Sequence, residues 1–216
     1  SILTKLELFA CIFSAIIHDC DHPGCNNNFL IATNHPLAIT HNDISPLENH
    51  HCSTGFKIAR ESNIFKDMSS TDYKTFRNLV INFVLGTDFG KSNEIVKRIK
   101  EATEEGGWST KKAECRKDLG LLCLKCADVG HVTKSVELHK IWTMRITEEF
   151  FNQGDKEREL NIPVSAGMDR NTVDLSSSQC FFIGNIVLPM VELFVNVLPN
   201  CNDRVIQGKR NMDFWK

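Results

Sequence analysis

Two imidazoles and two carboxylates stand within five residues near the start of the chain, in the stretch IHDCDHPG. They are His18, Asp19, Asp21 and His22. Imidazole nitrogen is a common zinc ligand, and a carboxylate can bridge from zinc to a second cation that prefers oxygen. The helix dipole also favours His at a helix end, so the stretch could be an ordinary helix end that runs into a Pro-Gly turn. By themselves, these residues favour a metal site only slightly.

The spacing of the two imidazoles sharpens this interpretation. If the first helix continues to residue 22, His18 and His22 lie four positions apart and share one face. Such a pair on a helix is moderate evidence for a bound metal. We expect Asp21 to support the turn into Pro23 and Gly24.

Two more groups of polar side chains strengthen the case for metal. The sequence Glu48-Asn49-His50-His51 places a carboxylate and two imidazoles on another expected helix. Asp128 follows an apolar helical run, and an unpaired carboxylate is costly to bury. A metal ion would be a suitable partner for Asp128, and a buried Arg or Lys would serve equally well.

The bulk composition excludes some classes of protein. A chain of 216 residues with 42% hydrophobic and 24% charged residues is typical of a globular protein. A net charge of -2 gives no support to nucleic-acid binding, which usually needs a strongly basic balance. The nine cysteines are scattered and odd in number, which favours free thiols in a reduced compartment. We therefore expect a cytoplasmic protein.

Neither apolar segment of the sequence reads as a membrane span. The opening residues lack a basic region and a cleavage signal, and Lys5 and Glu7 interrupt them. The run 181–198 carries a polar stripe at helical spacing, formed by Asn185, Pro189, Glu192 and Asn196. We expect a core helix there and no membrane contact from this segment.

Apolar residues recur at helical spacing along nearly the whole chain. The pattern predicts helices over 2–19, 45–61, 71–86, 92–103, 113–128, 134–152 and 177–198. No segment alternates over a strand's length, and no linker is long enough to divide domains. We therefore expect one all-α domain over residues 1–216, with its longest loop at 153–177.

Two of these helices begin with recognisable signals. Ser45 is expected to cap the second helix, with Pro46 at the first helical position and Glu48 three residues after the cap. Thr71 and Asp72 are expected to do the same for the next helix.

The order of these pieces resembles the catalytic domain of the class I 3′,5′-cyclic nucleotide phosphodiesterases, an all-α domain of the HD type. The resemblance runs from about residue 10 to about residue 200. The motifs that carry it are His18-Asp19-Cys20-Asp21-His22-Pro23-Gly24, Asn27, Phe29-Leu30, Asn42-Asp43, Leu47-Glu48-Asn49-His50-His51, Gly55-Phe56-Lys57, Thr87-Asp88, Ala127-Asp128, Trp142-Thr143, Arg145-Ile146, Glu148-Glu149-Phe150-Phe151, Gln153-Gly154-Asp155-Lys156-Glu157-Arg158-Glu159, Ser178-Gln179 and Phe182-Ile183.

The resemblance implies metal-dependent hydrolysis of cAMP and/or cGMP to the 5′-monophosphate, in cyclic-nucleotide signalling. A bridging hydroxide between Zn2+ and Mg2+ (or Mn2+) would attack the phosphorus. By similarity, His18 and Asp128 would bind the zinc, and Asp19 would touch both ions. The residues matching those that hold the water shell of the second ion are His22, Glu48 and Thr87.

The resemblance also implies a site for the purine base. Gln179 matches the glutamine that pairs with the purine edge, because an amide offers both a donor and an acceptor. Phe182 and Ile146 match the two sides of a hydrophobic clamp around the base, although plain core packing would also explain them. His131 stands where the family usually has a small polar residue near the purine, which leaves base selectivity open.

One part of the family pattern has no counterpart in this sequence. The family places a His-Asn-x-x-His segment upstream, whose first His is the general acid and whose second His is a further zinc ligand. Residues 1–17 do not match it, so the general acid is not present in this chain. We expect a catalytic domain truncated at its N-terminus, with regulatory domains or an anchor possible outside it. The alternatives are a non-catalytic binding module and a different HD-type phosphohydrolase.

Overall fold

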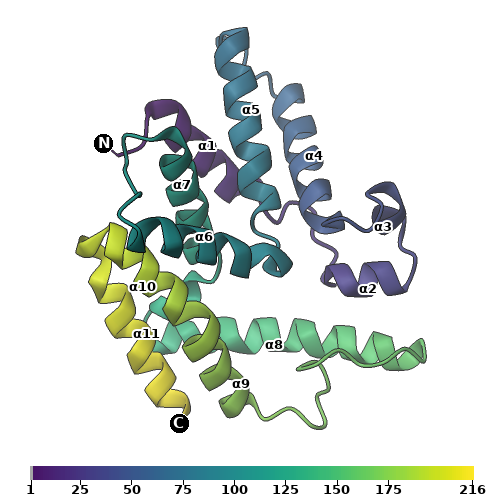
Figure 1. The fold of residues 1–216 in the computed structure, drawn as a ribbon. Helices are drawn as coiled ribbons and strands as arrows, with labels where there is room; N and C mark the ends of the chain where they lie inside the picture. The colour runs from purple at the N-terminus through teal and green to yellow at the C-terminus, as the bar shows by residue number, and fades with distance from the viewer. Residues whose placement is uncertain (1) are drawn as a thin grey trace. The chain divides into compact units, whose positions relative to one another are not determined.

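The computed structural model describes residues 2–216, apart from the side chains of residues 91–93 (Figure 1). Helices form its framework, and the described residues contain no β-strand, which confirms the expected all-α fold class. The chain divides into two compact units. The first contains Ser1–Pro23 and Asn34–Lys125, and the second contains Gly24–Thr33 and Cys126–Lys216.

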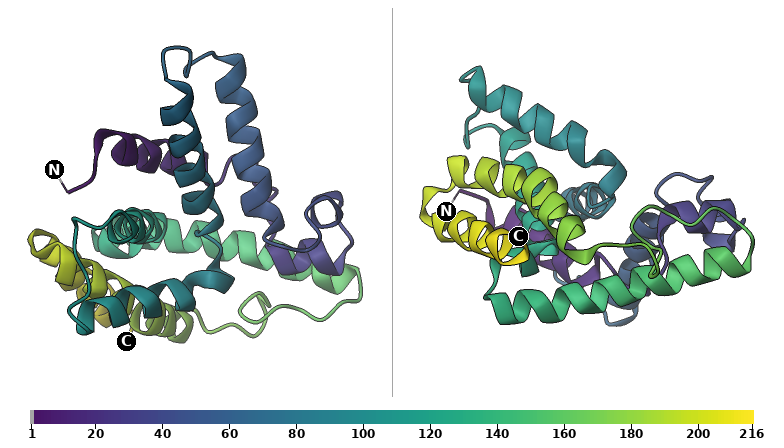
Figure 2. Two further views of the ribbon diagram at one scale, coloured as in Figure 1. Left: turned by 45° about the horizontal axis from the view of Figure 1, so that its top comes forward. Right: turned by 90° about the horizontal axis from the view of Figure 1, so that it is seen from below.

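The first unit packs its helices around a cluster of phenylalanine rings. Its elements are α1 (Lys5–Ile17), α3 (Pro36–Thr40), α4 (Pro46–Glu61), α5 (Ser70–Leu85), the 3-10 turn η1 (Phe89–Lys91), α6 (Ser92–Glu104) and most of α7 (Ala113–Asp128). Phe76 of α5 is fully buried, and its ring centroid lies 4.9–6.4 Å from those of Phe9, Phe13, Phe56 and Phe65. This apolar contact joins α1, α4 and α5, and α4 and α5 run side by side (Figures 1 and 2).

The second unit is built on the long helix α8 and the C-terminal helices. Its elements are α2 (Asn27–Ala32), the 3-10 turn η2 (Gly130–Thr133), α8 (Val136–Glu159), α9 (Leu175–Phe182), the π-helical turn η3 (Ile183–Val187), α10 (Leu188–Val197), the 3-10 turn η4 (Pro199–Cys201) and α11 (Asn202–Trp215). The fully buried Asn211 donates to the carbonyls of Val132 (2.7 Å) and Lys134 (2.9 Å). These bonds fasten α11 to η2 and to the residue that follows it, just before α8.

The seven predicted helices are present, and three others, two of them short, were missed. Helices α2, α3 and α11 were not expected from apolar spacing. The first two are only six and five residues long, too short for periodicity to show. Caps start both of them, because Asn26 accepts from the amide of Phe29 and His35 accepts from the amide of Leu37.

Both predicted helix caps were wrong in detail. Ser45 does precede α4, but its backbone is left-handed (φ 44°) and its side chain makes no capping bond. The Ser45 hydroxyl donates to Asp88 instead, at 2.6 Å. At α5 the cap is Ser69, whose hydroxyl oxygen accepts from the amide of Asp72. A tertiary partner at Ser45 has replaced the local bond that the sequence suggested.

Helix α8 continues beyond the predicted end, so the expected loop at 153–177 is shorter. The helix passes through Gly154 and stops at Glu159. The buried Glu157 then accepts hydrogen bonds from the Ser165 amide (2.6 Å), the Ser165 hydroxyl (2.7 Å) and the Gln153 amide group (2.8 Å). Burial acts to raise the pKa of Glu157, but these bonds outweigh it and lower the pKa. The connecting segment is therefore held against α8.

One continuous helical stretch, Leu175–Val197, is long and apolar enough to cross a membrane by composition alone. A core helix passes the same test. Ile183 and Val187, in its middle, are fully buried within the protein. Across the apolar window, 33% of the residues are buried within the protein, so a core helix stays an expectation.

Gly154 allows a close approach between α8 and the segment that follows it. A Cβ built at this position would lie 2.0 Å from the carbonyl oxygen of Met168, which is backbone and cannot move aside cheaply. We expect Gly154→Ala to lower the free energy of unfolding by about 2 kcal/mol or more, as overpacking does. Gly130→Ala is the matched control, because a Cβ there meets nothing within 4 Å. Urea unfolding of both variants checks this, and equal stability would contradict it.

Candidate metal centre and nucleotide site

The imidazole of His18 is oriented by the end of the helix that precedes it. Helix α1 ends at Ile17, so His18 caps it, and the helix does not continue to residue 22, the condition under which His18 and His22 would share a face. His18 Nδ1 lies 2.9 Å from the carbonyl oxygen of Ala15. A carbonyl only accepts, so Nδ1 must carry the proton and donate. In the neutral ring, the lone pair is then on Nε2.

That lone pair faces a carboxylate. His18 Nε2 lies 3.3 Å from Asp19 Oδ2. When the His18 ring is protonated, Nε2–H donates to Asp19, and this hydrogen bond lowers the pKa of Asp19; burial acts to raise it, and neighbouring imidazoles lower it further. With a neutral His18 ring, two electron-pair donors point at the same place, which suits a cation between or beside them. A fixed tautomer of this kind is how metal-binding imidazoles are usually held.

A second buried imidazole supports the same turn. His51 of α4 is 2% exposed, and its Nδ1 donates to the carbonyl of Cys20 at 2.7 Å. Its Nε2 lies 4.0 Å from Asp19 Oδ1. Burial lowers the pKa of His51. His51 therefore ties the turn that carries His18 and Asp19 to α4.

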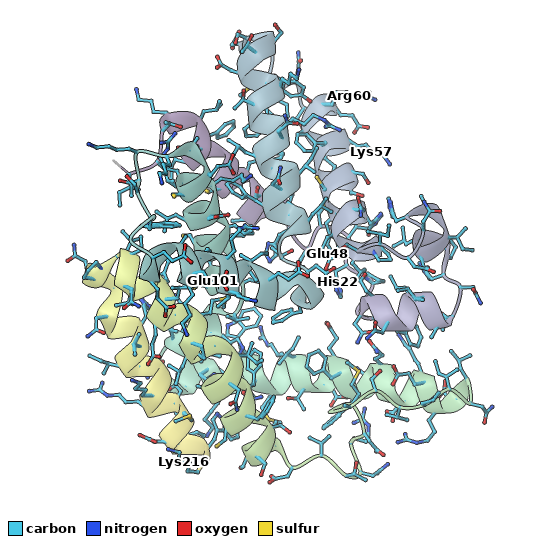
Figure 3. All side chains as sticks on the ribbon, viewed as in Figure 1. His22, Glu48, Lys57, Arg60, Glu101 and Lys216 are labelled. Atoms are coloured by element: carbon cyan, nitrogen blue, oxygen red, sulfur yellow. The ribbon has the colours of Figure 1, made fainter. Side chains whose placement is uncertain are left out.

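The residues predicted to hold the water shell of a second ion come from three places. His22 lies beyond the turn, with its ring stacked 5.5 Å from that of His51. Glu48 is in the first turn of α4 (Figure 3). Thr87 is buried just after α5, and its hydroxyl donates to the carbonyl of Val84 at 2.7 Å. Because that proton is used, the Thr87 oxygen is left to accept.

Asp21 pairs with an imidazole rather than only closing the turn. Its left-handed backbone (φ 61°) turns the chain, and its carboxylate lies 2.8 Å from His50 Nε2. The expected support for the turn therefore includes an unforeseen tie to α4.

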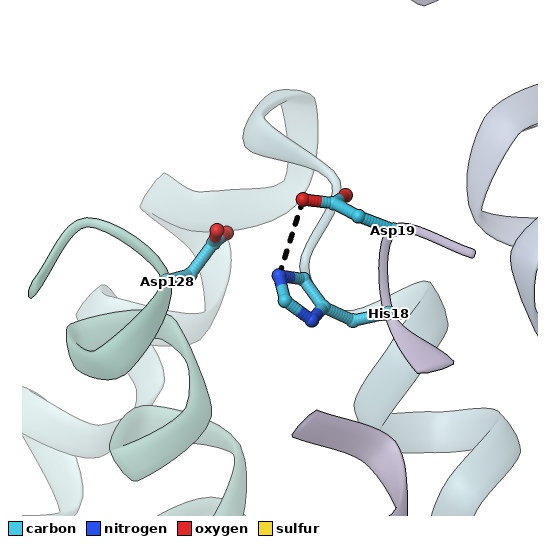
Figure 4. A group of neighbouring side chains, drawn as sticks. All are labelled: His18, Asp19 and Asp128. Carbon is cyan, nitrogen blue, oxygen red and sulfur yellow. Dashed lines mark ion pairs between the residues drawn. The ribbon is translucent and has the colours of Figure 1, made fainter. Parts of the chain in front are cut away.

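Asp128 is the last residue of α7. Figure 4 draws it with His18 and Asp19, and the dashed line marks the ion pair between the last two. These three side chains are of the types that could hold a metal ion. All nine cysteines are free, as expected from their scattered positions.

Gln179 sits at the end of a chain of hydrogen bonds in the second unit. The indole N–H of Trp215 donates to His139 Nε2 at 2.7 Å, so neutral His139 carries its proton on Nδ1. That nitrogen lies 3.1 Å from His131 Nδ1 and 3.5 Å from the Thr143 hydroxyl. The Thr143 hydroxyl therefore gives its own proton to Gln179 Oε1, at 3.4 Å.

This chain fixes the direction of the Gln179 amide. With Oε1 occupied by Thr143, the amide NH2 is left to donate. Gln179 is 9% exposed, as a held amide should be. His131, predicted to be near the purine, reaches Gln179 only through His139 and Thr143.

Phe182 and Ile146 occupy corresponding positions on the two helices joined by this bond. Ile146 follows Thr143 by three residues on α8, and Phe182 follows Gln179 by three residues in α9. Ile146 is 37% exposed, which argues against plain core packing for this residue. Their role as a clamp stays a prediction.

A family model described as 3'5'-cyclic nucleotide phosphodiesterase matches residues 1–207. The chain belongs to this family. It is 43% identical over 190 residues to the dual specificity calcium/calmodulin-dependent 3',5'-cyclic nucleotide phosphodiesterase 1C of Mus musculus. The matched region covers 87% of this chain and 26% of that protein. The Rattus norvegicus protein of the same name matches equally over 24% of its length.

A solved phosphodiesterase structure has the same fold. The structure of LmjPDEB1 in complex with IBMX superposes with a TM-score of 0.92 at 31% identity, over 99% of this chain and 66% of that chain. The resemblance seen in the sequence is confirmed. The chain spans about a quarter of the length of the two curated relatives.

Sequence reasoning missed the residues that support Gln179. His139, Thr143 and Trp215 are ordinary side chains in helical segments, and nothing in their spacing links them. Trp215 lies 76 positions from His139. Only the packing of α11 on α8 brings them together.

The buried His139 predicts a pH dependence of stability. Burial lowers its pKa from 6.5 to about 4, and the neighbouring His131 adds to the effect. Between these two values the unfolded chain binds more protons than the folded one, so stability is lost as the pH falls from 6.5 towards 4. The loss reaches about 3 kcal/mol at most. Urea unfolding at a series of pH values should show a weaker dependence in His139→Gln, and identical slopes would refute the assignment.

Proposed function

We propose that this chain forms the core of a catalytic domain that hydrolyses cAMP and/or cGMP to the 5′-monophosphate, with Zn2+ and Mg2+ (or Mn2+) as cofactors. The observation that carries the proposal is the fixed orientation of His18, whose Nε2 faces Asp19 in a chain of the phosphodiesterase family. The names of the mammalian relatives support a cyclic nucleotide as substrate.

His18, Asp19 and Asp128 would hold the zinc ion, and Asp19 would also reach the second ion. His22, Glu48 and Thr87 would accept from or donate to the waters around that second ion. Two bound cations would supply the charge that masks the phosphate and would lower the pKa of a bound water. The roles of all these residues are part of the proposal.

The base would be recognised in the second unit. The Gln179 amide, with its oxygen held by Thr143, would donate from its NH2 to an acceptor on the purine edge. Both purines carry such an acceptor, which is consistent with either nucleotide. Phe182 and Ile146 would contact the faces of the base, where an aromatic ring contributes about 1–3 kcal/mol.

Removing the proposed zinc ligand on α7 tests the metal assignment. Asp128→Ala in the full-length protein should reduce hydrolysis of both cyclic nucleotides to background, because a zinc ligand is lost. Zinc content, measured by elemental mass spectrometry, should fall with it. Glu114→Ala is the control, since Glu114 lies on the same helix with an 82% exposed side chain. Full zinc content and turnover in Asp128→Ala would disprove the assignment.

Removing the amide tests base recognition separately. Gln179→Ala should raise the KM for the nucleotide at least tenfold. The variant loses a neutral hydrogen bond to the base and the packing of the side chain, which together correspond to about 1.4 kcal/mol or more. Metal content should not change. Ser176→Ala, one turn earlier with an exposed side chain, is the control. If Gln179→Ala loses metal, its role is structural and the proposed contact with the base is wrong.

A further inference from the structure

A buried ammonium group lies in the first unit and has no part in the proposed chemistry. Lys125, on α7 one turn before Asp128, is 4% exposed. Lysine is almost never buried to this extent without partners. Its Nζ donates to the carbonyls of Gly86 (2.9 Å) and Thr87 (3.3 Å), and it lies 5.5 Å from the centre of the Phe89 ring.

The two carbonyls belong to the end of α5, where a positive charge is favourable. Gly86 caps that helix, and the last carbonyls of a helix lack intrahelical partners and carry partial negative charge. The Lys125 ammonium, on α7, supplies both a hydrogen-bond donor and a positive charge to the end of α5. It therefore fixes the backbone of Gly86 and Thr87.

The same contact is made tight by a glycine. A Cβ at Gly86 would lie 2.5 Å from Leu121 Cδ1, so the end of α5 is pressed against α7. Leu121 and Lys125 are four residues apart and share one face of α7. Apolar contact with Leu121 and a hydrogen bond from Lys125 thus both hold Gly86.

The segment is held from its other side as well. The Ser45 hydroxyl donates to Asp88 at 2.6 Å. Ser45 precedes Glu48 by three residues, and Glu48 lies in the first turn of α4. Thr87 and Asp88 are therefore fastened both to α7 and to the start of the helix that carries Glu48. Thr87 and Glu48 are two of the residues proposed to hold water around the second ion.

We propose that Lys125 is a positioning residue for the second divalent ion. Its ammonium holds the Thr87 backbone so that the Thr87 oxygen, whose proton goes to Val84, faces the ion's water shell as an acceptor. This inference rests on the proposed function, because the second ion is part of that proposal. In this proposal Lys125 acts through the Thr87 backbone.

The test measures the binding of Mn2+ alone to the zinc-loaded, full-length protein by calorimetry. Lys125→Met should bind Mn2+ at least about tenfold more weakly, the usual cost of losing an outer support of a metal site. Lys125→Arg, which keeps charged N–H donors, should restore most of that affinity. Lys125→Gln should fall between them and serves if Lys125→Met does not fold. Lys117→Met is the control, because Lys117 lies on α7 and pairs with Glu114 at the surface.

Hydrogen exchange of the amides at 86–90 separates positioning from general stability. It should quicken in Lys125→Met while zinc content and nucleotide KM at saturating Mg2+ stay unchanged. Wild-type Mn2+ affinity in both Lys125→Met and Lys125→Gln overturns the role, even if exchange quickens. If the wild-type protein itself binds no Mn2+, the proposed function and the role of Lys125 are both overturned. Unchanged affinity in the variants overturns the role of Lys125 alone.

Discussion

Backbone carbonyls left open at helix ends are satisfied by side chains, and these bonds hold the candidate site in place. His18 donates to Ala15 at the end of α1, and Lys125 donates to Gly86 at the end of α5. An all-helical protein has many such ends, and each buried carbonyl needs a donor. Here the donors belong to the side chains that the site uses or that lie beside it. The bonds that satisfy the helix ends therefore also set the geometry of the candidate site.

The two compact units orient their polar groups in different ways. In the first, a bond to a backbone carbonyl fixes imidazole tautomers, because a nitrogen that donates to a carbonyl leaves the other nitrogen with the lone pair. His18 and His51 are both held this way. In the second unit, a buried chain from Trp215 through His139 sets the direction of an uncharged amide. One arrangement prepares groups for a cation, and the other prepares a donor for a base edge.

Close backbone approach is the second constraint on the molecule. Gly86 lets the end of α5 reach α7, and Gly154 lets the segment after α8 return to it. At Gly154 the glycine also explains a wrong expectation. Its residue type suggested the end of a helix, yet α8 continues through it, and the missing Cβ leaves room for the backbone of Met168. A glycine within a helix can thus mark a contact instead of a break.

The sequence by itself determined the helical class, the seven long helices and the family, because apolar spacing and the ordered motifs around His18, Glu48, Asp128 and Gln179 are local patterns. It could not supply the Ser45 bond to Asp88 or the Lys125 bonds to the end of α5, since these partners lie about 40 residues apart. It suggested a buried Arg or Lys as one partner for Asp128, and a buried lysine does lie one turn away, bonded to carbonyls. Which hydroxyl caps a helix, and which imidazole nitrogen keeps its proton, was decided only by tertiary packing. The physical reason is that each polar group takes the best partner available when buried, and that partner is often distant in sequence.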